Sequence, residues 1–143
     1  MLNALHLRKS NEEKMRKKKI MIIDDNKEFA EELKEVLNLD GYDAVAFFDG
    51  TSAMGMISRI KPDLILLDLK LIGKSGFQVA YELKSFPKTA NIPIIAMTGF
   101  YTEKEHMELM KICGIKTCLI KPFDSQEVIA KIEDVLEKGS DKS

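Results

Sequence analysis

In the stretch Lys19-Ile20-Met21-Ile22-Ile23-Asp24-Asp25, an unbroken apolar run ends in two adjacent carboxylates. Short, continuous apolar runs are typical of strands buried on both faces of a parallel sheet. Three further stretches have the same form and end in a polar residue. They are Leu64–Leu67 before Asp68, Ile92–Met97 before Thr98, and Cys118–Ile120 before Lys121. We therefore predict four parallel strands of this kind.

The segments between these runs have helical patterns, and strands and helices alternate about every twenty residues, as in βαβ units. Thr102 and Glu105 have the spacing of a capping box at the start of one helix. The prediction is an α/β fold, a flavodoxin-like doubly wound sheet of five parallel strands in the order 2-1-3-4-5, with five helices. We expect helices over 26–39, 51–60, 77–85 and 125–136, a helix between Thr102 and Gly114, and a further strand over 42–47.

The polar residues that follow the strands are predicted to form one site. In an open α/β sheet, ligands bind in the crevice outside the carboxyl ends of the strands. Three crowded carboxylates repel one another, which raises the pKa of at least one of them unless a cation joins them. A set of oxygen ligands favours Mg²⁺, which takes one or two carboxylates together with waters and phosphate oxygens. The residues expected to converge are Asp24, Asp25, Asp68, Thr98 and Lys121.

The predicted site has the groups that phosphoryl transfer requires. A metal ion can shield a carboxylate so that its oxygen attacks a phosphorus centre, and carboxylate nucleophiles form aspartyl-phosphates. A lysine ammonium and a threonine hydroxyl can bind the equatorial oxygens of the transferring group. The residues therefore predict an aspartate that accepts a phosphoryl group.

Four motifs give the chain a resemblance to a known family. The chain resembles a bacterial-type response-regulator receiver domain of two-component signalling, of the stand-alone chemotaxis type, over about residues 18–138. An aspartate after an apolar run is common in α/β proteins, but four motifs in the family's order are a specific signal. They are Ile22-Ile23-Asp24-Asp25-Asn26, Leu66-Leu67-Asp68-Leu69, Met97-Thr98-Gly99 and Ile120-Lys121-Pro122-Phe123.

The resemblance implies a role for each acidic residue. Asp68 would be the phosphoacceptor, and Asp24 and Asp25 would hold Mg²⁺ together with it. In the family, the residue two past the acceptor lends the metal a backbone carbonyl, and here that residue is Lys70.

The remaining motifs imply contacts to the phosphoryl group. Thr98 would donate a hydrogen bond to it and Lys121 would form an ion pair with it. The Lys121–Pro122 bond is cis in the family, and proline makes this conformation inexpensive. The implied function is that of a switch that phosphorylates and dephosphorylates itself, not a turnover enzyme. Its expected partners are a sensor histidine kinase or a histidine phosphotransfer protein, and a downstream protein target.

Three residues lie at the rim of the site, where the family varies, and a fourth residue departs from the family pattern. Lys70 places a long cation there, Phe100 is a bulky apolar residue, and Gly99 leaves the pocket open. Cys118 stands three residues before Lys121, where the family usually has the tyrosine or phenylalanine that rotates inward on activation. A thiol is too small for that rotation. We therefore expect output through the face of the fourth helix, fifth strand and fifth helix without a rotating ring, with Met107 or Met110 exposed on the fourth helix.

Length and charge suggest one domain with a distinct leader. A chain of 143 residues suits a single domain with a sizeable core. Residues 1–19 hold seven Lys or Arg against two Glu, whereas residues 20–143 hold fifteen against twenty-one Asp or Glu. We expect a charged, flexible N-terminal extension over 1–17, a receiver domain over 18–138 and a polar tail over 139–143. No output domain is expected within these residues, so the chain is either a stand-alone receiver or a fragment of a longer regulator. The basic leader is interpreted as solvated, so nucleic-acid contact is not expected.

The cysteines and the hydropathy pattern bear on the compartment. Cys113 and Cys118 without a secretory signal are typical of reduced thiols in a cytoplasmic protein. No apolar stretch approaches the roughly 18 residues that a membrane span requires. We therefore expect a cytoplasmic protein without a membrane span.

Other interpretations of these residues remain open. A haloacid-dehalogenase-like phosphohydrolase also uses an aspartate at a strand end, but it needs a second aspartate two residues on, where this chain has Lys70. The chain could be a pseudo-receiver that binds without being phosphorylated, or a relay intermediate that passes its phosphoryl group to a histidine. Asp24 and Asp25 could also simply cap a helix, and Lys121 could be an ordinary lysine at a strand end.

Overall fold

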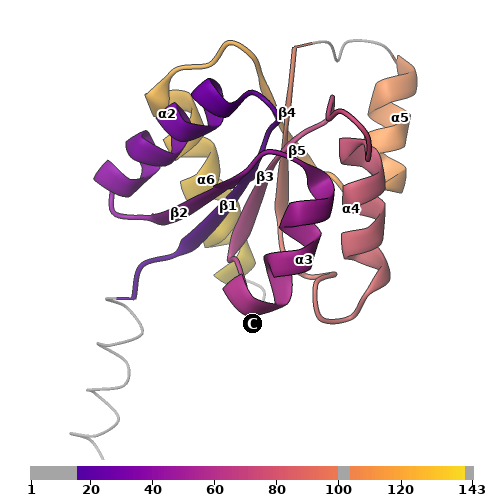
Figure 1. Cartoon of the computed structure of the whole chain (residues 1–143), viewed down its shortest axis with the longest axis horizontal. Helices are drawn as coiled ribbons and strands as arrows, with labels where there is room; N and C mark the ends of the chain where they lie inside the picture. Colours follow the sequence, from indigo (N-terminus) through magenta and orange to yellow (C-terminus); the bar gives the residue numbers. More distant parts are fainter. Residues whose placement is uncertain (1–15, 100–103, 141–143) are drawn as a thin grey trace, which may run out of the picture.

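The computed structural model describes residues 16–99 and 104–140, which form a parallel sheet with helices on both faces (Figure 1). Its elements alternate strictly between strand and helix. The strands are β1 (Lys19–Ile23), β2 (Asp43–Phe47), β3 (Leu64–Asp68), β4 (Ile94–Thr98) and β5 (Thr117–Ile120). The helices are α2 (Lys27–Leu39), α3 (Gly50–Ile60), α4 (Gly76–Ser85), α5 (Lys104–Ile112) and α6 (Ser125–Ser140).

The strand order is β2-β1-β3-β4-β5, and every neighbouring pair is parallel, which confirms the predicted order 2-1-3-4-5. The chain moves from β1 outward to β2 and then crosses to β3 on the other side of β1. This reversal of strand order opens a crevice at the carboxyl ends of β1 and β3. The register pairs Ile23 with Leu67, so Asp24 and Asp68 follow at the same level of the sheet.

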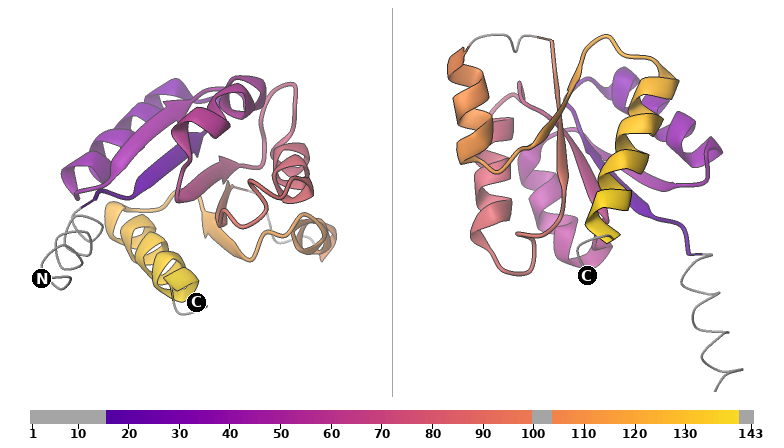
Figure 2. Two further views of the ribbon diagram at one scale, coloured as in Figure 1. Left: turned by 90° about the horizontal axis from the view of Figure 1, so that it is seen from below. Right: turned by 180° about the vertical axis from the view of Figure 1, so that it is seen from behind.

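Figure 2 shows helices on both faces of the sheet, and one apolar cluster lies between the helices and the sheet on each face. Alternate residues of each strand point to opposite faces, so Ile20 and Ile22 pack against α2 and α6, whereas Met21 and Ile23 pack toward α3, α4 and α5. Every residue of β3 and β4 is buried, because helices cover both sides of these strands. This double burial explains why the strands consist of unbroken apolar runs.

Side-chain caps mark the first residues of three helices, α2, α3 and α4. The Asn26 side chain accepts a hydrogen bond from the Phe29 N–H and caps α2. Asp49 caps α3 in the same way. Ser75 and the Gln78 side chain form a reciprocal capping box on α4. Each cap satisfies a helix N–H that has no partner within the helix, and so fixes where the helix begins.

Some element boundaries differ from the predicted ones. The second strand begins at Asp43, because the Tyr42 N–H donates to the Leu37 carbonyl, 3.0 Å away, and still belongs to the turn after α2. Helix α6 runs to Ser140, so the first two residues of the predicted polar tail are helical. The predicted Thr102 cap and residues 1–15 of the predicted extension lie outside the described residues.

Helix α5 ends close to where the sequence predicts, since Gly114 follows it with a positive φ of 75° that favours glycine. Among residues 16–99 and 104–140, no helix combines the length and apolar character needed to cross a membrane.

Candidate functional site: a carboxylate cluster at the carboxyl edge of the sheet

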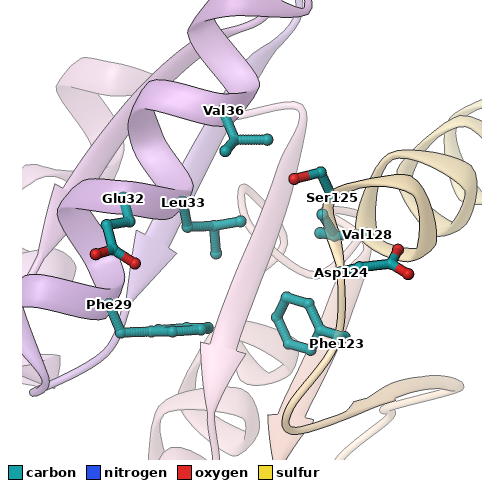
Figure 3. A pocket seen from close by; sticks show the side chains of 8 residues that line it. All are labelled: Phe29, Glu32, Leu33, Val36, Phe123, Asp124, Ser125 and Val128. Atoms are coloured by element: carbon teal, nitrogen blue, oxygen red, sulfur yellow. The ribbon is translucent and has the colours of Figure 1, made fainter.

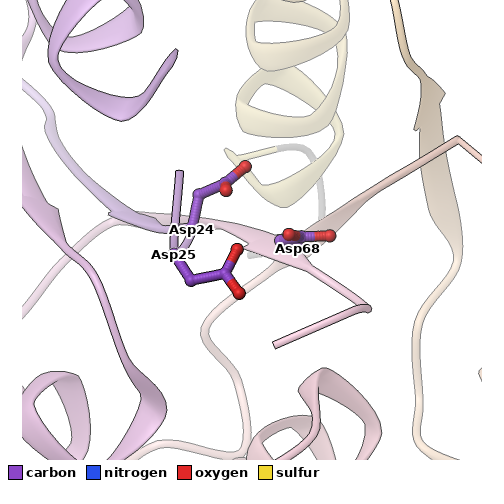
Figure 4. A group of neighbouring side chains, drawn as sticks. All are labelled: Asp24, Asp25 and Asp68. Carbon is purple, nitrogen blue, oxygen red and sulfur yellow. The ribbon is translucent and has the colours of Figure 1, made fainter. Parts of the chain in front are cut away.

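Three aspartates meet at the crevice between β1 and β3 (Figure 4). Asp24 and Asp25 follow β1, and Asp68 is the last residue of β3. Each offers a carboxylate oxygen, and these oxygens all lie within 4.8 Å of one another. Asp24 is fully buried and Asp68 nearly so, while Asp25 is partly exposed. The carboxylates predicted to converge therefore do so.

Asp24 is the most tightly held of the three. Its backbone N–H donates to the Phe47 carbonyl at 3.0 Å, which ties it to the end of β2. Its Oδ1 accepts from the Asn26 N–H at 2.9 Å, and its Oδ2 accepts from Lys121 Nζ at 2.7 Å. A buried charge needs partners of this kind, and here Lys121 supplies the opposite charge.

Asp68 has weaker compensation for its charge. Its Oδ1 accepts from the Lys70 N–H at 3.1 Å, and its Oδ2 lies 3.8 Å from Lys121 Nζ. Burial raises the pKa of Asp68 above its ordinary value, and the charges of Asp24 and Asp25 raise it further. The Lys70 N–H and the Lys121 ammonium act on this pKa in the opposite direction, without cancelling the rise. A divalent cation would relieve this repulsion, so the donor set fits one.

Lys121 and Thr98 border the carboxylates from the neighbouring strands. Lys121 follows β5 and is joined to Pro122 by a cis peptide bond, as the resemblance implies. Its backbone N–H donates to the Thr98 carbonyl at 2.8 Å, which couples the end of β4 to the chain after β5. Thr98 is buried as the last residue of β4, one strand away from Asp68.

The loop after Asp68 passes very close to α4. A Cβ atom added to Gly76 would collide with the Asp68 carbonyl oxygen and lie 2.7 Å from Leu69 Cα. The Gly76 N–H also donates to the Leu69 carbonyl at 3.3 Å. Only glycine fits this approach of helix and loop. The sequence places Gly76 directly before the predicted helix over 77–85, but the contact that requires glycine there is tertiary and cannot be seen in the sequence.

The predicted modulating residues have different surroundings. The Lys70 side chain and Gly99 are exposed at the rim, and Phe100 lies outside the described residues. Cys118 is partly buried against the apolar cluster of α3, α4 and α5, with its Sγ 3.8 Å from the Leu119 carbonyl oxygen. Burial raises the pKa of the Cys118 thiol, which keeps it neutral. The Cys118 thiol therefore lies where the family usually has an aromatic ring.

Two aromatic residues beside Lys121 were missed as parts of the site. The ring of Phe29 lies 4.4 Å from Lys121 Nζ, measured to the ring centroid. Phe123 packs edge-on against Phe29, with ring centroids 5.7 Å apart. The sequence places Phe29 in the first turn of the predicted helix over 26–39 and assigns it no role in the site. A phenylalanine in the first turn after the Asp24-Asp25 pair is the signal that could have suggested more.

Comparisons with known proteins agree with this architecture. Residues 20–133 match the model of the response regulator receiver domain, so the chain belongs to that family. The predicted resemblance is therefore confirmed, and the chain is a receiver domain of two-component signalling.

Curated relatives are longer than this chain. The DNA-binding response regulator MtrA of Mycobacterium tuberculosis is 31% identical over 126 residues, which cover 88% of this chain and 54% of that protein. The chain thus spans about half the length of the curated relatives it matches.

Solved structures share the fold. The receiver domain of a DNA-binding response regulator from Colwellia psychrerythraea is 32% identical, with a TM-score of 0.76 over 84% of this chain and 98% of that one. A CheY-like receiver domain protein from Methanospirillum hungatei has a TM-score of 0.83 at 20% identity, over 90% of this chain and all of that one.

Proposed function

We propose that Asp68 accepts a phosphoryl group from a phosphohistidine of a sensor histidine kinase or a histidine phosphotransfer protein. The observation that carries this proposal is the position of Asp68, whose carboxylate is buried beside Asp24 and Asp25 and within 3.8 Å of Lys121 Nζ. Crowded carboxylates destabilise the fold unless they serve a ligand, and no second aspartate stands at position 70 to support hydrolase chemistry.

The carboxylates fit Mg²⁺ as the resident ion. Asp24, Asp25 and Asp68 would hold it, and the backbone carbonyl of Lys70 would complete the protein ligands. Mg²⁺ supplies positive charge that lets an anionic phosphoryl donor approach the acceptor. With Mg²⁺ and the phosphoryl group bound, the Lys121 ammonium would contact both Asp24 and the phosphoryl oxygens.

In the proposed transfer, the phosphoryl group moves from the donor histidine to Asp68. An Asp68 carboxylate oxygen attacks phosphorus, and the new O–P bond forms as the P–N bond to the donor histidine breaks. The histidine nitrogen leaves with the electron pair and takes up a proton. Lys121 binds one phosphoryl oxygen and the Thr98 hydroxyl binds another, which places the group for transfer and later for hydrolysis. The protein would thus act as a switch and not as a turnover enzyme.

The signal would leave through the face formed by α5, β5 and α6. Met107 of α5 is 52% exposed, as predicted, whereas Met110 is partly buried. Ile112 and, on β5, Ile120 are also exposed, so apolar side chains extend across two elements. Apolar side chains gathered on a surface suit a protein partner. Because Cys118 replaces the usual ring, movement of Thr98 toward the phosphoryl group would bias α5 without an aromatic rotation.

The partners beyond the phosphodonor are proposed by chemistry alone. A downstream protein target would bind the apolar side chains of α5 and β5, in the cytoplasm. The name of MtrA describes DNA binding by that longer protein. Residues 20–143 of this chain carry more acidic than basic side chains, so we propose no nucleic-acid contact for them.

Incubation with acetyl phosphate or phosphoramidate and Mg²⁺, followed by intact mass measurement, tests the proposed function. The wild type should gain the mass of one phosphate, and EDTA should abolish the gain. Asp68→Asn should gain none, because the oxygen and nitrogen of an amide are much poorer nucleophiles than a carboxylate oxygen. Equal labelling of wild type and Asp68→Asn would contradict the assignment.

A further inference from the structure

Phe29 lies against the ammonium group of the lysine at the site. Lys121 Nζ is 4.4 Å from the centroid of the Phe29 ring, 2.7 Å from Asp24 Oδ2 and 3.8 Å from Asp68 Oδ2. The face of an aromatic ring attracts a cation at such a distance, most strongly where water is excluded. The Lys121 side chain is 24% exposed, so part of the surrounding water is excluded.

Phe29 is held in place by one contact of its backbone and one contact of its ring. The Phe29 backbone N–H donates to the Asn26 side chain at 3.1 Å, which fixes its position in the first turn of α2. The ring of Phe123 packs against it at an interplanar angle of 77°. Such an edge-to-face pair is a preferred arrangement of two aromatic rings.

A hollow of about 130 Å³ lies between α2 and α6, and the Phe29 and Phe123 rings point into it (Figure 3). Phe29 lines this hollow, whereas Lys121 does not. A lysine side chain has a flexible four-carbon stem. Shortening the Phe29 side chain would therefore open space beside the Lys121 ammonium.

We propose that Phe29 is a positioning residue that holds the Lys121 ammonium in place beside Asp24 and Asp68. This inference rests on the proposed function, in which Lys121 binds the incoming phosphoryl group. Asp24 binds the ammonium at 2.7 Å and would draw it away from the acceptor. The Phe29 ring attracts the ammonium and so limits the positions that the Lys121 side chain can take. Because the ring carries no net charge, it does not repel the anionic phosphoryl donor.

Site-specific replacement of Phe29 by phenylalanines with one, two and three ring fluorines tests the proposal. Fluorine withdraws electron density from the ring face and changes the shape little, so the attraction to the ammonium falls in steps. The initial rate of labelling by phosphoramidate with Mg²⁺ should fall with each fluorine, by about two- to fivefold over the series. The melting temperature should fall by no more than a few degrees, because the same attraction also contributes to the stability of the folded protein.

Phe48 offers a matched control, because its ring lies 5.4 Å from the ammonium of Lys27, a lysine outside the carboxylate cluster. The same fluorine series at Phe48 should leave the labelling rate unchanged. A flat rate across the Phe29 series, or an equal fall in the Phe48 series, would overturn the positioning role.

A second readout does not depend on phosphorylation. In the protein without Mg²⁺, the Hε protons of Lys121 should be shifted upfield by the Phe29 ring current, and Phe29→Leu should remove this shift while Phe29→Tyr keeps it. Lys121 signals that do not respond to Phe29→Leu would overturn the inference. If the wild type accepts no phosphate, the proposed function fails, and these proton shifts still decide whether Phe29 holds the ammonium.

Discussion

Strand β3 is flanked by two aspartates with opposite surroundings. At its amino end, the Asp63 Oδ2 accepts from the Lys19 N–H at 2.8 Å, and its Oδ1 lies 3.8 Å from Arg16. At its carboxyl end, Asp68 is buried beside two further carboxylates. The two residues are separated by only four apolar residues.

The two ends of the β3 segment serve stability and chemistry separately. Asp63 has a backbone donor and a cation for its single charge, so its contacts stabilise the start of the sheet. Asp68 shares one lysine with Asp24, so the carboxyl edge has an excess of negative charge. An uncompensated charge costs stability unless a ligand binds to it. This contrast predicts which substitutions weaken the fold and which affect only the site.

Substitution at Gly76 should weaken the fold most, because the backbone of α4 packs tightly beside Asp68. Gly76→Ala should lower the free energy of unfolding by about 3 kcal/mol, because its Cβ would collide with the Asp68 carbonyl and the chain must shift. Gly55→Ala in α3 is the matched control, since nothing lies within 4 Å of a Cβ there. That change should stabilise the helix by about 0.5–1 kcal/mol. Urea denaturation of both variants gives their free energies of unfolding. An equal change in the two variants would contradict the prediction.

The excess of negative charge at the carboxyl edge predicts a metal-dependent stability. Millimolar Mg²⁺ should stabilise the wild type by roughly 1–3 kcal/mol, because the ion binds only the folded cluster. Asp25→Ala should abolish this effect while leaving the stability without Mg²⁺ unchanged or higher. Thermal unfolding with Mg²⁺ and with EDTA gives the measurement. A wild type whose melting temperature ignores Mg²⁺ would contradict the proposed metal site.

Removal of the Asp63 carboxylate should weaken the fold in a way that Mg²⁺ does not alter. Asp63→Ala leaves the partly buried Lys19 N–H without its acceptor and should cost about 1–2 kcal/mol. The Mg²⁺ effect on stability should remain that of the wild type, since the site lies at the other end of β3. Loss of the Mg²⁺ effect in this variant would show that the two ends are not independent.

The smallest expected effect is a gain of stability from removal of the Asp68 charge. In EDTA and low salt, Asp68→Asn should stabilise the fold by about 1 kcal/mol near neutral pH, the scale of two unit charges 4 Å apart in water. Because folding raises the pKa of Asp68 above its ordinary 3.8, the folded state binds this proton more readily than the unfolded chain does. The wild type therefore loses stability as pH rises from about 4 through the raised pKa.

The difference in free energy of unfolding between Asp68→Asn and the wild type should therefore shrink as pH falls from the raised pKa of Asp68 toward about 4. Urea titrations of both proteins at several pH values measure it. A difference that does not depend on pH would show that the Asp68 carboxylate carries no strain in the folded state.

Much of the fold could be predicted from the sequence because the strands are buried on both faces. Double burial requires unbroken apolar runs, which mark β1, β3 and β4 directly. Parallel strands then bring the residues after each run to one edge, so the carboxylate cluster follows from strand order alone. The end of α6 was predicted less well, because Gly139 and Ser140 suggest a stop although the helix continues through them.

The unpredicted features depend on how distant elements pack. The ring of Phe29 meets Lys121 only because α2 and the chain after β5 lie on the same side of the sheet. The need for glycine at position 76 arises where α4 passes the Asp68 backbone. Neither contact leaves a periodic pattern in the sequence, so only the structure could reveal them.

Of the two aspartates at the ends of the β3 segment, only Asp68 is expected to accept a phosphoryl group. Phosphoramidate and Mg²⁺ should add one phosphate to the wild type and to Asp63→Asn, and none to Asp68→Asn, when the three proteins are compared by intact mass under the same conditions. The Asp63→Asn variant should fold, because the oxygen of its new amide side chain can still accept from the Lys19 N–H. Labelling that survives Asp68→Asn, or that is lost with Asp63→Asn in a folded protein, would contradict the account.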